Sequence, residues 1–147
     1  MAYGTGFTGL RINPIVVADG ATYSVKTDNT GKIHIMPNLT ADCTITLPAA
    51  FNGAHYTFIY SGAAADAQDW IINTAATTEL FKGGLVHIDT DAGSGGDEAV
   101  PVAADASDDD TMTILVPDVG TTVTVVSDGT SWYVTGSVVS ATAPTFA

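Results

Sequence analysis

The sequence is poor in positive charge. Its 147 residues include only four Lys and Arg against 16 Asp and Glu, which gives a net charge of −12. The imbalance grows along the chain, because residues 83–147 contain ten acids and no Lys or Arg. Binding to nucleic-acid phosphates or to anionic membranes depends on Lys and Arg, so the composition argues against both functions.

Cysteine and long apolar runs are equally scarce. The one cysteine, Cys43, excludes an intramolecular disulfide framework. It shares a predicted strand face with Ile45 and Leu47, which favours a small buried side chain over a nucleophile. No stretch approaches the roughly 20 apolar residues of a membrane span. The opening MAYGTGFTG also lacks the basic start and apolar run of a secretory signal. We therefore expect a protein that is made and assembled inside a cell without crossing a membrane.

Familiar catalytic motifs are missing from the sequence. It contains no G-x-S-x-G elbow and no P-loop. The histidines His34, His55 and His87 fall on three different predicted strands, without the HxH or HxxxH spacing that would support a zinc site. We interpret them as isolated histidines on polar faces. The sequence therefore predicts a protein that is not an enzyme and holds no cofactor.

Residues 89–110, which we call the acidic loop, carry eight acids and no base. Asp89 and Asp91 match the start of a calcium-binding loop. The match then fails, because Ser94 stands at the sixth loop position, where Gly is required, and Val100 at the twelfth, where Glu is required. We predict a solvated loop, with weak calcium binding or docking of a basic partner as the alternatives.

The abundant residues indicate a single packed all-β domain. Apolar residues make up 46% of the chain and charged residues only 14%. Short alternating segments, separated by turn signals about every 8–12 residues, predict a β-sandwich or jelly-roll-like barrel of roughly eight short antiparallel strands and hairpins. We assign residues 14–140 to this domain, with a flexible Gly-rich arm at 1–13 and a C-terminal tail at 141–147.

Two early segments carry clear strand signals. IVVADGATYSV predicts a hairpin, closed by a type I′ turn at Asp19 and the glycine after it. GKIHIMPN alternates, which places Ile33 and Ile35 on one face and Lys32 and His34 on the other. The assignment of the two isoleucines to the core side follows from their apolar character.

The segment TVTVVSDGTSWYVTG, residues 122–136, predicts a closing hairpin. A two-residue turn at Asp128 and Gly129 would place Val125 opposite Trp132 and point Tyr133 away from the core. Across the whole domain we expect one set of inward-facing residues. They are Ile45, Leu47, Phe58, Ile114, Val123, Val125 and Trp132.

The segments TITLPAAFNGAHYTFIY and VTVVSDGTSWYVTG resemble small structural proteins of tailed bacteriophages. The shared pattern is a short strand ending in Leu-Pro, a Gly-led aromatic strand and a closing DG-turn hairpin with Trp and Tyr. The resemblance covers about half of the chain. The matching residues are Leu47, Pro48, Gly53, Tyr56, Phe58, Asp128, Gly129, Trp132, Tyr133 and Gly136.

The resemblance implies a non-enzymatic virion protein that decorates and stabilises a phage capsid, a decoration or cement protein. Such a protein is made in the host cytoplasm and sits on the outer capsid surface. The major capsid protein and further copies of the chain, as a homotrimer that bridges neighbouring capsomers, are then the expected partners. Candidate contacts are Tyr3, Phe7 and Leu10 in the arm, together with Tyr133.

Two other functions stay open at this point. One is a receptor- or glycan-binding module of a phage fibre, in which an exposed Trp70, Tyr60 or Tyr133 would stack on sugars. The other is a small lyase or hydrolase on a β scaffold. The enzyme is the least favoured of the functions considered, because the sequence contains no familiar catalytic motif.

Overall fold

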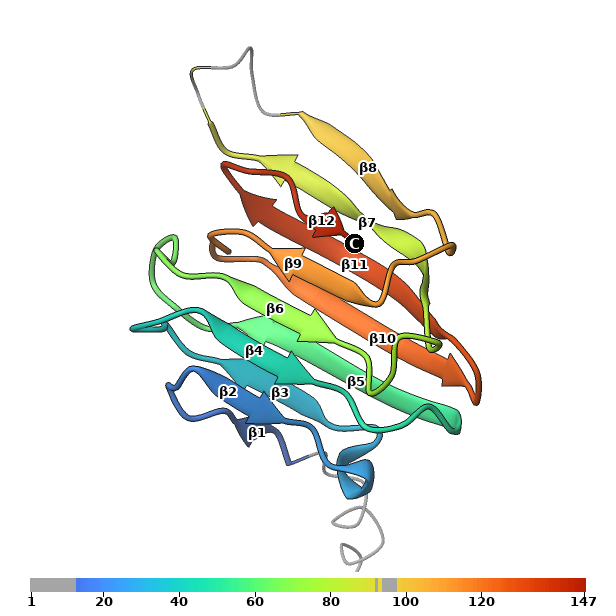
Figure 1. Cartoon of the computed structure of the whole chain (residues 1–147). Helices are drawn as coiled ribbons and strands as arrows, with labels where there is room; N and C mark the ends of the chain where they lie inside the picture. Colours follow the sequence, from blue (N-terminus) through green and yellow to red (C-terminus); the bar gives the residue numbers. More distant parts are fainter. Residues whose placement is uncertain (1–12, 92, 94–97) are drawn as a thin grey trace, which may run out of the picture.

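The computed structural model describes residues 13–91, 93 and 98–147 of the chain. The expected contacts Tyr3, Phe7 and Leu10 lie outside these residues. The described residues form twelve β-strands and a single 3-10 turn at Thr27–Asn29 (Figure 1). None of them belongs to a helix that is long and apolar enough to cross a membrane.

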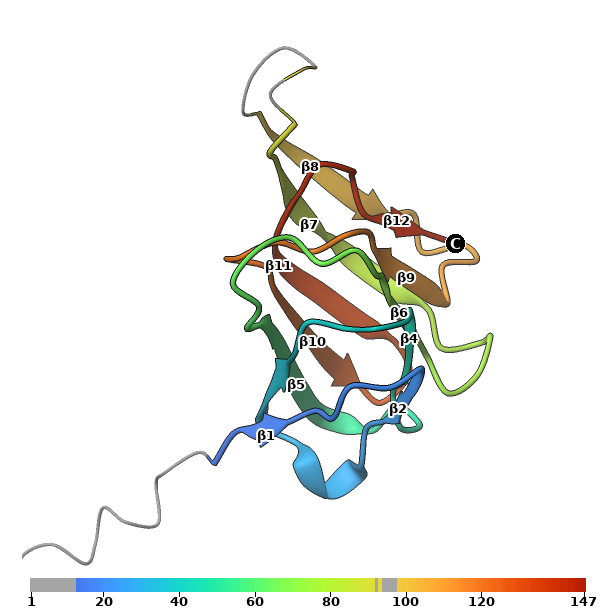
Figure 2. The same cartoon turned by 90° about the vertical axis from the view of Figure 1, so that its left-hand side faces the viewer.

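The strands form two sheets that pack face to face as a β-sandwich (Figures 1 and 2). In spatial order, the seven-stranded sheet contains β1 (Ile15–Val16), β3 (Ile33–Met36), β5 (Asn52–Tyr60), β10 (Thr122–Asp128), β11 (Trp132–Ser140), β7 (Phe81–Asp89) and β8 (Ala99–Ala104). The five-stranded sheet contains β12 (Thr145–Phe146), β9 (Thr111–Ile114), β6 (Trp70–Asn73), β4 (Cys43–Thr46) and β2 (Thr22–Ser24). The predicted all-β sandwich is therefore confirmed, with more strands than expected.

The first seven strands alternate between the two sheets, so the chain winds back and forth across the core. Each odd-numbered strand from β1 to β7 lies in the seven-stranded sheet, and β2, β4 and β6 lie in the other. A strand that returns to its sheet after one full turn runs in the same direction as its predecessor. Four strand pairs are accordingly parallel: β1–β3, β3–β5, β2–β4 and β4–β6. A fifth parallel pair, β7–β11, joins strands that are further apart in the chain. The expectation of antiparallel strands throughout is wrong.

The predicted hairpin at Asp19 is also wrong. The strands on either side of it, β1 and β2, belong to different sheets, so this segment crosses over the edge of the sandwich. The Asp19 carboxylate instead accepts hydrogen bonds from the backbone N–H and the hydroxyl of Thr40, at 3.0 and 2.9 Å. A short polar link between two strands fits a crossover as well as a hairpin, and packing between the sheets decides between them.

The core between the sheets contains the inward-facing residues that the alternation predicts. All seven are at most 1% exposed: Ile45, Leu47, Phe58, Ile114, Val123, Val125 and Trp132. Cys43 is buried beside them as a free cysteine. The alternation assigns Ile33 and Ile35 to the wrong side, however, because His34 and Met36 are the fully buried residues of β3.

The closing hairpin joins β10 and β11, but its register differs from the prediction by two residues. Val125 lies opposite Val134, and Trp132 lies opposite Ser127. The turn is longer than expected because the Asp128 carboxylate accepts hydrogen bonds from two turn N–H groups, at 2.8 and 2.9 Å. A shift of two residues keeps every side chain on its face. Trp132 therefore still points into the core and Tyr133 away from it.

Two segments that the sequence suggested to be irregular contain strands. Strand β8 lies within the acidic loop and pairs with β7 as an edge strand. Strand β12 lies within the expected tail at 141–147, and the backbone of Ala147 exchanges two hydrogen bonds of 2.9 Å with Thr111. Both strands cover the end of the core that the alternating windings leave open (Figure 1).

Candidate functional site

No described segment forms a second layer over the outward side of the seven-stranded sheet (Figure 2). We call the outward-pointing side chains of β1, β3, β5, β10, β11, β7 and β8 the outer face. Seven large apolar side chains of the described residues are exposed, and five of them lie on this face. They are Val16, Val86, Ile88, Val126 and Tyr133. Exposed apolar side chains that gather on one face of a protein are typical of contact surfaces.

Uncharged β-branched side chains fill the centre of the outer face. Thr57 on β5 lies opposite Thr124 on β10, and their hydroxyl oxygens are 3.0 Å apart. Ile59 lies opposite Thr122 in the same pair of strands, and both are half-buried by their neighbours. The strands thus present a continuous surface of methyl and hydroxyl groups.

The outward side of the five-stranded sheet is different in character. Its paired positions are mostly hydroxyl residues, with Thr22 opposite Thr44, and Ile71 opposite both Thr44 and Thr113. Ile71 is half-buried, and this side of the described chain contributes no exposed large apolar side chain. The comparison singles out the outer face of the larger sheet as the apolar one.

The carboxylates are placed away from both sheet surfaces. Those of the described residues lie in loops, in the 3-10 turn or at the last residue of a strand, as Asp89 does on β7 and Asp128 on β10. Lys82, His55 and Tyr133 are charged or titratable side chains that point outward within the strands of the outer face. Since loops lie at strand ends, the negative charge forms a rim at the two ends of the strands, and the middle of the outer face carries no carboxylate.

Tyr133 lies where the outer face meets this rim. Its hydroxyl donates to the Asp128 carboxylate at 3.0 Å, and the Lys82 ammonium nitrogen lies 5.9 Å from the centre of its ring. Hydrogen bonds from the Ser131 and Thr130 N–H groups, and then from Tyr133, lower the pKa of Asp128. The hydrogen bond to Asp128 raises the pKa of Tyr133. At neutral pH the tyrosine is therefore a neutral donor, held in one orientation by a carboxylate.

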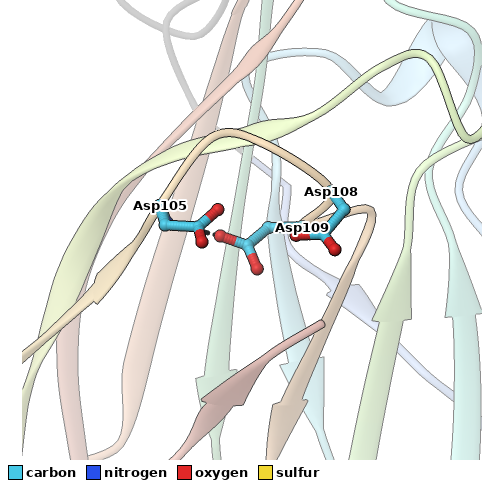
Figure 3. Close-up of side chains that lie close together, drawn as sticks. All are labelled: Asp105, Asp108 and Asp109. Atoms are coloured by element: carbon cyan, nitrogen blue, oxygen red, sulfur yellow. Dashed lines mark hydrogen bonds between the residues drawn. The ribbon is translucent and has the colours of Figure 1, made fainter.

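Three carboxylates of the acidic loop gather between β8 and β9, those of Asp105, Asp108 and Asp109 (Figure 3). They already accept hydrogen bonds from the turn itself. Asp109 accepts from the N–H groups of Asp105 and Ala106, and Asp105 accepts from the Ser107 N–H and hydroxyl at 2.8 and 2.7 Å. The bonds from Ser107 lower the pKa of Asp105. These hydrogen bonds within the turn explain why the three carboxylates lie close together. Calcium binding at this cluster stays an untested alternative.

The three histidines occupy three strands and have three different environments. His34 is fully buried, which corrects its assignment to a polar face: burial between aromatic rings lowers its pKa. His55 is exposed on the outer face. His87 is buried, with its Nε2 atom 3.0 Å from the carbonyl oxygen of Ser140. They lie on β3, β5 and β7 and do not form a common site, since the metal-type groupings of the described residues contain no histidine.

Two of the three aromatic residues considered for sugar stacking are buried. Trp70 is 0% exposed and Tyr60 is 4% exposed, and the Tyr60 hydroxyl donates to the Ala64 carbonyl at 2.7 Å. Tyr133, at 44% exposed, is the one that reaches the surface. The described residues enclose no pocket. Of the three aromatic side chains expected to stack on sugars, Tyr133 is therefore the accessible one, and its hydroxyl already donates a hydrogen bond to Asp128.

Comparison with known proteins adds no relative. No protein-family model matches the chain, and no curated protein is similar to it at a level that indicates kinship. Of the candidate contacts, the structure places Tyr133 at the margin of the outer face. Sequence reasoning missed the face itself, although its signal is present: the positions that alternate with the core residues in TVTVV and LVHID are uncharged.

Proposed function

We propose that the chain is a non-enzymatic structural protein of a tailed bacteriophage that decorates the capsid and stabilises it by bridging neighbouring capsomers. One observation carries the proposal. A β-sandwich exposes a partly apolar sheet surface whose carboxylates are confined to the strand ends, and this surface has the character of a contact surface in a larger assembly.

The closing hairpin supports the same proposal through the residues that resemble phage virion proteins. Three of them have a defined role in the fold. Asp128 fixes the turn, Trp132 fills the core, and Tyr133 points outward beside the rim. One side of the hairpin is thus fixed in the core and the other side is exposed to a partner, which suits a small protein that functions by binding to a larger assembly.

The proposed assembly is a homotrimer at a three-fold or quasi-three-fold position of the shell. Closed symmetry covers exposed strand surfaces without open-ended growth. A protein that binds the assembled shell more tightly than its parts stabilises the shell by linkage. The choice of a trimer over other oligomers follows from the resemblance to phage decoration proteins. The expected contacts Tyr3, Phe7 and Leu10 belong to the arm.

Labelling of virions tests the proposal directly. Antibody against the chain should decorate the whole head of negatively stained particles, and label confined to the tail tip would favour the fibre module instead. Capsids stripped of the protein should disrupt at a lower temperature than decorated capsids, and re-addition of the protein should restore the difference. Equal disruption temperatures would rule out a cementing role.

Deletion of residues 2–10 separates the arm from the folded domain. The sequence predicts a Gly-rich arm that contributes little apolar area to the core, so the truncated protein should keep the unfolding temperature of the full chain. Its occupancy on stripped capsids should fall. Full occupancy by the truncated protein would remove Tyr3, Phe7 and Leu10 from the list of contacts without affecting the decoration role.

A further inference from the structure

We infer that Asn52 is the site of a spontaneous covalent modification, in which its side-chain amide is converted to a carboxylate through a cyclic imide formed with Gly53. The conversion needs water and no enzyme. It follows from the chemistry of the chain itself, so the inference does not rest on the proposed function. It is carried by the residue that follows Asn52, by the turn that holds both residues and by the hydrogen bonds of the competing side chains.

The reaction consumes one water molecule and releases one ammonia molecule. The backbone nitrogen of Gly53 attacks the Cγ atom of Asn52 and closes a five-membered ring, which is favoured because the step is intramolecular. The bond from Cγ to the amide nitrogen breaks, and that nitrogen leaves as ammonia with the proton from the Gly53 N–H. Water then opens the ring at one of its two carbonyl carbons. Opening at Cγ leaves an aspartate at position 52, and opening at the main-chain carbonyl leaves an isoaspartate.

Asn52 and Gly53 are the central residues of a tight turn at the start of β5. The Ala54 N–H donates to the Phe51 carbonyl at 3.1 Å, and Gly53 has φ +84°, as at the second central position of a type II turn. Asn52 and Gly53 are both exposed. Apart from the chain neighbours, no atom lies within 4 Å of the Cβ position of Gly53, so the ring has room to form beside it. Glycine also has no side chain to hinder its own nitrogen.

The residue after each asparagine singles out Asn52. The chain has five asparagines, and Asn52 is the one that precedes a glycine. Asn13 precedes a proline, whose nitrogen carries no hydrogen to release. The other three precede Thr or Leu, and a branched side chain next to the attacking nitrogen hinders ring closure.

Side-chain hydrogen bonds also distinguish the asparagines. The Lys32 ammonium group donates to Asn29 Oδ1 at 3.3 Å, and the Tyr60 hydroxyl donates to Asn38 Oδ1 at 3.0 Å. The side chain of Asn52 has no hydrogen-bond partner among the described residues. Its amide can therefore rotate toward the attacking nitrogen without breaking a contact.

Two Asp-Gly pairs could form the same ring, at Asp19 and Asp128. A carboxyl group closes the ring by losing water, which requires its protonated form. The Asp19 carboxylate accepts two hydrogen bonds from Thr40, and Asp128 accepts hydrogen bonds from turn N–H groups and from the Tyr133 hydroxyl. These bonds favour the ionised form, and those at Asp128 lower its pKa. Both pairs should therefore react more slowly than Asn52.

The new carboxylate would lie next to the turn of the closing hairpin. Asn52 on β5 lies opposite Asp128 on β10, and the Cβ position of Gly129 is 3.3 Å from the Asn52 backbone nitrogen. Like charges directly opposite each other on antiparallel strands destabilise the pair. Conversion should therefore weaken the end of the hairpin that carries Tyr133, and lower the unfolding temperature by about 1–4 °C.

Peptide mapping by mass spectrometry tests the inference on the full chain, incubated at 37 °C and mildly alkaline pH. Position 52 should convert before the other asparagines and yield both aspartate and isoaspartate. Asn52→Gln should abolish the conversion, because glutamine would have to close a larger ring, and the matched control Asn29→Gln should leave it unchanged. The chain unfolded in urea provides the intrinsic rate. The folded chain should react within about tenfold of that rate, since opening an exposed turn requires little free energy.

The outcomes decide both the site and its effect. A folded chain that keeps the amide while the unfolded chain loses it overturns the inference, as does faster conversion of another asparagine. Thermal unfolding of Asn52→Asp against Asn52→Gln measures the effect on the hairpin. Asn52→Asp should unfold about 1–4 °C lower at neutral pH, and the difference should shrink below about pH 4, where the new carboxylate is protonated. Equal unfolding temperatures at neutral pH would overturn the effect on the hairpin.

Discussion

Acid sensitivity of the fold should originate at His34, which lies between the two sheets. Its ring stacks on Phe58 with the ring centres 5.0 Å apart, and the rings of Tyr23 and Tyr56 approach it edge-on at 5.8 and 6.0 Å. The side chain is fully buried, and neither ring nitrogen has a hydrogen-bond partner among the described residues. Burial is the main cause that lowers the pKa of this histidine in the folded protein. The backbone of Thr57, which does not reach hydrogen-bond geometry, opposes this shift, and the positive charge of Lys32 adds to it.

The sign of the effect follows from that direction. In the unfolded chain the histidine has a pKa of about 6.5, so below this pH the unfolded state binds a proton that the folded state resists. The free energy of unfolding is therefore unaffected by His34 above about pH 6.5 and falls as the pH drops toward the folded pKa. The slope is at most about 1.4 kcal/mol per pH unit, which gives a loss of up to about 2 kcal/mol between pH 6.5 and 5.

Urea unfolding of the natural chain and of His34→Leu, at several pH values from 7.5 to 5, measures this contribution. As the pH falls, His34→Leu should become more stable relative to the natural chain by up to about 2 kcal/mol in free energy of unfolding, because it lacks the buried histidine. The carboxylates affect both proteins equally, so their contribution cancels in the difference. The exposed His55 provides the control, and His55→Gln should follow the natural chain. A difference between His34→Leu and the natural chain that stays constant over the whole range would refute the reasoning.

Two further predictions concern the backbone and the acidic loop. Gly136 on β11 has φ +145°, and a Cβ added there would lie 2.1 Å from the carbonyl oxygen of Thr122. Gly136→Ala should therefore lower the free energy of unfolding by about 2–4 kcal/mol. Gly20→Ala, where no atom lies within 4 Å of the added Cβ, should change it by less than about 1 kcal/mol, and equal losses for the two variants would contradict the argument. Millimolar calcium should leave the thermal unfolding temperature unchanged, because hydrogen bonds of the turn already occupy the carboxylates of the acidic loop. A calcium-dependent rise that magnesium does not reproduce would establish a metal site there.

Local pattern was sufficient for part of the fold. The residues around Ile45, Phe58 and Val125 alternate cleanly between apolar and polar positions, and their burial follows from that alternation alone. In β3 the same rule fails, because an isoleucine pair and a His–Met pair compete for the core, and both faces of the strand carry apolar groups. Ile33 and Ile35 lie on the outer face, so the pattern within β3 does not reveal which side of the strand packs against the second sheet.

The candidate site was less accessible to sequence reasoning. Tyr133 was correctly placed on the outward side of its strand, because its neighbour Trp132 is the larger apolar residue and takes the core position. Trp70 was misjudged because Ile71 and Ile72 follow it directly, so this short apolar run does not alternate and does not indicate which face is buried. The apolar outer face needs residues from strands that are far apart in the sequence, and no single segment displays it.

The sequence by itself determined the all-β class, most of the inward-facing residues, the closing hairpin and the acidic character of the chain, because each depends on residues within a few positions of one another. The tertiary structure decided which strands are neighbours, that half of the strand pairs run parallel, and that His34 lies in the core. It also brought Val16, Val86 and Val126 to one surface. The physical reason is that a short strand can hydrogen-bond equally well to several partners, and the choice among them is made by packing across the whole sandwich.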